Sequence, residues 1–137
     1  MPHPARINIR RLVEYPDTDA SGHYQHAAVL RWVEAAEAVL HARLGVADRT
    51  FGSSPRLHFE VDYQLPLWFL DEVDVELVAG RVGRTSVRWD FKVRRGDALA
   101  ASGHFVAAHV PVAGTGAEAW PEDLRRAFTE GGDRSHA

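Results

Sequence analysis

One long amphipathic segment, residues 27–44, constrains the fold of this chain more than any other feature. The apolar residues that recur there at helical spacing are Val29, Trp32, Ala36, Leu40 and Leu44. Gly45 follows at the position where a C-terminal cap is typical. The opposite side carries several alanines instead of a row of charges, which indicates close packing on more than one side. We therefore predict a central helix rather than a surface helix.

The sequence period changes to two after this helix and an intervening loop at residues 45–55. The segments with strand-like patterns cover residues 7–15, 57–65, 73–77, 87–93 and 98–110. A short helix is predicted over residues 121–128, with a proline in its first turn. One antiparallel sheet wrapped on the long helix satisfies this order of elements, so we predict an α+β fold. Such a sheet has open edges, which favours pairing with a second copy of the chain.

The composition excludes several classes of protein. The chain has 137 residues, 45% of them hydrophobic, which fits one domain over residues 1–137. It has no cysteine, so disulfides, thiolate metal sites and a cysteine nucleophile are excluded. A net charge of -3 gives no reason to expect a nucleic-acid partner. No apolar run approaches the ~18 residues of a membrane span and no leader is apparent, so we expect a soluble, cytoplasmic protein.

Titratable side chains crowd the short connection between the first strand and the long helix, at Asp17, Asp19, His23 and His26. The start of a helix presents unpaired backbone N–H groups, which suit a developing oxyanion on a carbonyl. A carboxylate a few residues earlier can attack that carbonyl or activate a water beside it. Aspartates are also good turn residues, because their side chains bond to nearby backbone N–H groups. From spacing alone, both interpretations stay open.

The other histidines and the arginines carry weaker signals. His23 and His26 have the spacing of half a metal site, but no further ligand set has convincing spacing. We therefore expect neither a metal nor a cofactor. Histidines on the predicted strands are more typical of structural residues than of catalysts; they are His58, His104 and His109. Arginines on the strands favour a solvated face over a site for a phosphate-bearing cofactor; they are Arg84, Arg88, Arg94 and Arg95.

The connection and the helix together resemble the hotdog-fold acyl-CoA thioesterases, the group that includes the 4-hydroxybenzoyl-CoA thioesterases and the bacterial Tol–Pal-associated acyl-CoA thioesterases. The resemblance lies in the run Val-Glu-Tyr-Pro-Asp-Thr-Asp-Ala-Ser-Gly-x-x-x-His-Ala over residues 13–27, followed by Leu-Arg-Trp-x-Glu at residues 30–34. Weaker similarity extends it to residues 6–110, which leaves 111–137 as a C-terminal extension. It implies an antiparallel sheet around one long central helix, the hotdog fold.

The resemblance also implies roles for individual residues. Asp19 is similar to the family's catalytic carboxylate, which acts as nucleophile or as general base. His26 and Tyr15 match residues used in the acyl-CoA branch. Positions that the resemblance places around the substrate are Gly22, His23 and Ala27. The family works as homodimers or homotetramers with active sites between subunits, and the same assembly is expected here.

These features lead us to expect a hydrolase that cleaves an acyl-CoA or acyl-carrier-protein thioester to a free acid and a thiol. No Gly-x-Ser-x-Gly elbow is present, which disfavours serine-hydrolase chemistry. A hotdog dehydratase or hydratase stays open, although Tyr24 stands where that group has a histidine. A non-catalytic module that binds acyl thioesters also stays open, as does the release of a chain from a carrier protein in a biosynthetic cluster.

Overall fold

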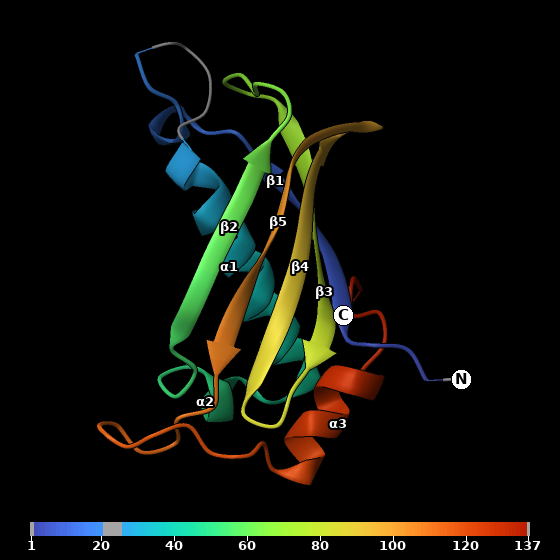
Figure 1. Cartoon of the computed structure of the whole chain (residues 1–137). Helices are drawn as coiled ribbons and strands as arrows, with labels where there is room; N and C mark the ends of the chain where they lie inside the picture. Colours follow the sequence, from blue (N-terminus) through green and yellow to red (C-terminus); the bar gives the residue numbers. More distant parts are fainter. Residues whose placement is uncertain (1, 21–25, 137) are drawn as a thin grey trace.

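The computed structural model describes residues 2–20 and 26–136. Five antiparallel strands form one sheet in the order β1-β3-β4-β5-β2. The strands are β1 (Arg6–Leu12), β2 (Arg56–Tyr63), β3 (Glu72–Val82), β4 (Ser86–Arg95) and β5 (Ala98–Ala108). The helices are η1 (Tyr15–Asp17), α1 (His26–Leu44), α2 (Ala47–Thr50) and α3 (Glu122–Glu130). Figure 1 shows that α1 runs along one face of the sheet and that α3 lies at one end of the sheet.

The core lies between α1 and the sheet because the apolar positions of both face each other. In β3 and β4 every second residue is buried along most of the strand, which is the alternation predicted from the sequence. The largest side chains in this layer are Trp32 from α1 with Trp89, Phe91 and Phe105 from the sheet. Residues of α3 reach the same core through Leu124 and Phe128. The predicted α+β hotdog fold with one central helix is thus confirmed.

Several element boundaries differ from the sequence prediction, and two of the differences concern short helices. The first strand ends at Leu12, and Tyr15 lies instead in η1, where Glu14 and Asp17 form a reciprocal capping box. The loop predicted at residues 45–55 contains the single turn α2, too short to leave a periodic signal. The C-terminal cap at Gly45 is as expected, because its φ of 76° lies in the left-handed region.

The two edges of the sheet differ in how they are covered. The C-terminal segment runs along β1: the Arg6 N–H donates to the Gly132 carbonyl at 3.0 Å, and the Arg134 N–H donates to the Arg6 carbonyl at 2.8 Å. β2 is the last strand at the opposite edge. Two of its apolar side chains are exposed, Leu57 by 63% and Tyr63 by 44%. β2 is therefore the edge that is open for pairing.

None of the helices in the described part of the chain combines the length and the apolar character needed to cross a membrane.

Candidate functional site

The turn before α1 is held by the carboxylate of Asp17. One oxygen of Asp17 accepts a hydrogen bond from the Glu14 backbone N–H at 2.8 Å. The other accepts one from the Arg31 guanidinium on α1 at 2.9 Å. The residue is only 7% exposed. Both oxygens of Asp17 therefore serve to tie η1 to the helix, which matches the supporting role of a turn aspartate.

Asp19 lies two residues further on and is exposed. The described backbone resumes at His26, where α1 begins. The predicted site residues Gly22 and His23 lie outside the described residues, as does the side chain of His26. Ala27 is exposed in the first turn of α1. The structure thus describes an exposed carboxylate on one side of the undescribed segment and the start of a 19-residue helix on the other.

Tyr15 stands beside an exposed aromatic residue from a distant part of the chain. Its carbonyl accepts hydrogen bonds from both the N–H and the hydroxyl of Thr18, at 3.1 and 2.7 Å. Tyr15 is 75% exposed, and its ring meets the ring of Phe69 edge-on, with the centroids 5.9 Å apart. Phe69 belongs to the connection between β2 and β3.

This connection carries consecutive apolar side chains that are largely exposed, namely Trp68 (47%), Phe69 (49%) and Leu70 (59%). Two backbone hydrogen bonds hold it against Val13: the Leu70 N–H donates to the Val13 carbonyl at 2.9 Å, and the Val13 N–H donates to the Asp71 carbonyl at 2.8 Å. Leu70 has a φ of 73°, a strained value for a leucine. This surface was not predicted from the sequence. Its signal was the apolar run that follows Pro66, between two strands that alternate with polar residues.

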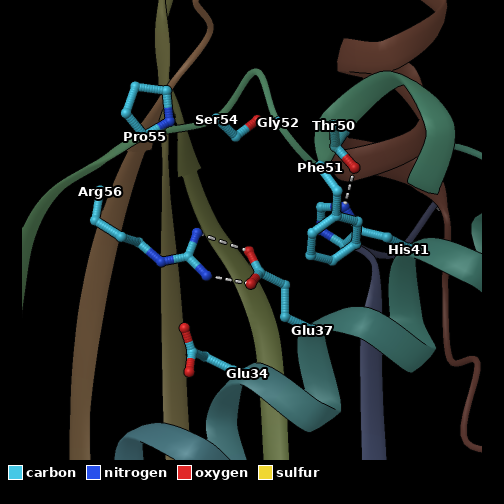
Figure 2. A pocket seen from close by; sticks show the side chains of 9 residues that line it. All are labelled: Glu34, Glu37, His41, Thr50, Phe51, Gly52, Ser54, Pro55 and Arg56. Carbon is cyan, nitrogen blue, oxygen red and sulfur yellow. Dashed lines mark hydrogen bonds and ion pairs between the residues drawn. The ribbon is translucent and has the colours of Figure 1, made fainter.

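A second group of charged residues lies further along α1 and lines a cavity of about 280 Å³ (Figure 2). Both oxygens of Glu37 are bound by the guanidinium of Arg56, at the start of β2. The same guanidinium lies 4.4 Å from the centre of the Phe105 ring. Burial raises the pKa of Glu37, although Arg56 opposes this change. Because both carboxylate oxygens are engaged, this pair is suited to joining α1 to the sheet rather than to attacking a substrate.

His41 borders the same cavity and is 3% exposed. Nδ1 of His41 is hydrogen-bonded to the Thr50 hydroxyl at 2.7 Å, and the same hydroxyl lies 3.2 Å from the Val46 carbonyl. Nε2 has no hydrogen-bond partner within the described residues. Burial, with a smaller effect of Arg56, lowers the pKa of His41 to about 4. The imidazole is therefore neutral near pH 7.

Comparison with known proteins shows to which family the chain belongs. Residues 13–128 match the thioesterase-like superfamily, so the chain belongs to this family. A 1,4-dihydroxy-2-naphthoyl-CoA hydrolase from Synechococcus elongatus is 33% identical over 95 residues, which cover 65% of this chain and 70% of that protein. The chain is a hotdog thioesterase, and the prediction of a thioester hydrolase is confirmed.

Solved structures agree with this assignment. A thioesterase from Thermus thermophilus, complexed with coenzyme A and Zn, is 29% identical, with a TM-score of 0.79 over 89% of this chain and 90% of that one. A predicted thioesterase from Bacillus stearothermophilus has a TM-score of 0.81 over 90% of this chain and 94% of that one. At 23% identity, this second similarity concerns the fold alone.

Proposed function

We propose that this thioesterase hydrolyses an aromatic acyl-CoA thioester and that Asp19 is its catalytic carboxylate. The observation that carries the assignment of Asp19 is its exposed position just ahead of the start of α1. Asp17 and Glu37 are buried and bound to arginines, whereas Asp19 is exposed just ahead of the helix. The resemblance to hotdog thioesterases assigns the reacting acid to the same residue.

The proposed reaction uses the start of α1 to polarise the thioester. The first N–H groups of a helix have no partner within it, and together with the helix dipole they stabilise negative charge on the carbonyl oxygen. Asp19 attacks the carbonyl carbon, or removes a proton from the water that attacks it. The carbon–sulfur bond then breaks, and the departing thiolate takes up a proton to become the CoA thiol. If Asp19 is the nucleophile, water then hydrolyses the mixed anhydride that it formed, which releases the free acid and restores the Asp19 carboxylate. His26 assists the water, and Tyr15 flanks the reacting group.

Two observations favour an aromatic acyl group on coenzyme A. The curated relative is named for 1,4-dihydroxy-2-naphthoyl-CoA, and the Thermus thioesterase holds coenzyme A. In this chain Tyr15 lies four residues before Asp19, and its exposed ring meets the exposed ring of Phe69. Aromatic rings stack favourably on flat acyl groups. We infer that this pair of rings contacts the acyl group.

The proposal includes a homodimer or a homotetramer that forms through the open edge at β2. An exposed strand edge pairs readily with a second copy of itself. The resemblance places the active site between subunits, where the exposed Asp19 becomes enclosed. We place the enzyme in the cytoplasm, where CoA thioesters are available as substrates.

A panel of thioesters tests the function directly. The purified protein is offered aromatic acyl-CoAs, straight-chain acyl-CoAs and an acyl carrier protein, and the released thiol is measured. We expect the highest kcat/KM on an aromatic acyl-CoA. Preference for the carrier protein would contradict the proposed substrate class, and hydration of an enoyl-CoA without thiol release would contradict thioester hydrolysis by this site.

A further inference from the structure

Three potential metal ligands meet on the face of the sheet that points away from α1. His58 and Glu60 alternate with the inward-facing Phe59 on β2, and Glu60 pairs directly with His104 on β5. The two histidines are far apart in the sequence, so no spacing motif reveals the group. The register of the two strands brings them together.

The distances within this cluster suit a small metal ion. His58 Nε2 lies 2.8 Å from Glu60 Oε1, and His104 Nε2 lies 3.4 Å from the same oxygen. One ligand atom from each residue lies within 4.8 Å of the others. Tetrahedral zinc with bonds near 2.0–2.1 Å keeps its ligands roughly 3.3 Å apart. Small rotations of these partly exposed side chains are enough to reach that spacing.

The cluster lies beside a groove in which two neighbouring carboxylates are bound by arginines and do not compete with Glu60 for a cation. Glu60 and His104 line this groove, which has a volume of about 560 Å³. The Glu76 carboxylate in the same groove is bound by Arg6 at 3.1 Å. Asp90 is bound to Arg88 at 2.9 Å. A side chain at Gly103 would collide with the Glu60 carbonyl and the Phe91 ring, so the glycine permits the approach of β2 to β5.

We propose that His58, Glu60 and His104 bind one Zn²⁺ per chain, with water in the fourth position. Two imidazoles and one carboxylate form a ligand set that is typical of zinc. Calcium and magnesium favour oxygen ligands alone. Asp90 does not supply the fourth ligand, because Arg88 holds it. The site is on the opposite face of the sheet from α1, so the proposal is independent of the role given to Asp19.

The test uses full-length protein without a histidine tag, stripped of metal and titrated with Zn²⁺ against a chromophoric chelator. The test variants are Glu60→Gln and His104→Gln. Asp62→Asn is the matched control, because Asp62 lies two residues from Glu60 on the same strand and lines the same groove. His23→Ala controls for the alternative pair His23 and His26. Circular dichroism verifies that each variant is folded.

We expect one Zn²⁺ per wild-type chain and at least a tenfold weaker affinity in Glu60→Gln and His104→Gln, with both controls unchanged. Tetrahedral absorption bands of bound Co²⁺ should disappear in the same two variants, which gives a readout independent of affinity. Equal affinity in wild type and both test variants would overturn the proposal, as would a loss confined to His23→Ala. Octahedral Co²⁺ spectra in the wild type would also overturn it.

Discussion

Two aspartates only two positions apart have different surroundings. Asp17 is buried under a guanidinium and a backbone N–H, whereas Asp19 is exposed. A buried carboxylate whose oxygens accept hydrogen bonds within the protein stabilises a turn, and an exposed one near the helix start can be reached by a substrate. The sequence motif alone left both interpretations open for each residue.

Replacement of Phe69 tests whether the exposed rings contact the acyl group. Phe69→Ala removes the edge-on partner of Tyr15. We expect kcat/KM on an aromatic acyl-CoA to fall by about 3–10-fold, the value of one aromatic contact, with a smaller change on a short aliphatic acyl-CoA. Steady-state kinetics on both substrates measures this difference. Phe51→Ala is the matched control, because Phe51 has a similar exposure of 48% and follows α2. Equal losses in both variants would contradict the proposed contact.

At the scale of elements, α1 is the part of the fold most fully predicted from sequence. Its apolar period and the glycine after it are strong local signals, and the helix occupies almost the predicted residues. β3 and β4 were predictable for the same reason, since alternation survives wherever one face is buried. The short elements η1 and α2 were missed because one turn leaves no period. The exposure of apolar residues on β2 could not be predicted. Alternation of apolar and polar residues identifies a strand, but it does not show whether another element packs on the apolar face.

The buried imidazole near the end of α1 should make stability depend on pH. His41 has a pKa of about 4 in the folded protein and an ordinary value of 6.5 when unfolded. Between these values the unfolded chain binds a proton that the folded chain does not, so stability falls as the pH drops from 6.5 to 4. The full decrease in the free energy of unfolding is about 3 kcal/mol.

Urea denaturation at several pH values measures this dependence. In His41→Gln we expect the part of the pH slope between 6.5 and 4 that belongs to His41 to disappear. The exposed His3 provides a control, because His3→Gln should retain the wild-type slope. A pH slope in His41→Gln that equals that of the wild type would show that His41 does not titrate as we describe.

At the scale of the whole molecule, the open edge of the sheet should control assembly. β1 is covered by the C-terminal segment, whereas β2 ends the sheet with Leu57 and Tyr63 exposed. Lysine on an edge strand opposes pairing. We expect wild-type protein to sediment as a dimer or tetramer, and the double variant Leu57→Lys/Tyr63→Lys to sediment as a monomer with reduced thiol release. Val112→Lys, at a similarly exposed apolar position, should assemble normally. An assembly that is unchanged in the double variant would show that the subunits meet elsewhere.

The features of the sites that could not be predicted are contacts between segments far apart in the sequence. Tyr15, Asp19, Gly22 and His26 lie in one short run, so the resemblance was enough to nominate these residues. The contacts that join distant segments depend on the register of the sheet and the path of its loops; they are the pairing of Glu37 with Arg56, the packing of Tyr15 on Phe69 and the approach of Glu60 to His104. The local pattern of each strand does not show which of its residues pair with which residues of the neighbouring strand.

The most direct test of the account is the turnover of Asp19→Asn on the preferred thioester, measured by thiol release. We expect kcat to fall by about 10²–10⁴-fold, the usual contribution of a general base, and urea denaturation verifies that the variant is folded. Glu34→Gln, an exposed carboxylate on α1, should retain full activity. Near-normal turnover by Asp19→Asn would show that Asp19 is not the catalytic carboxylate.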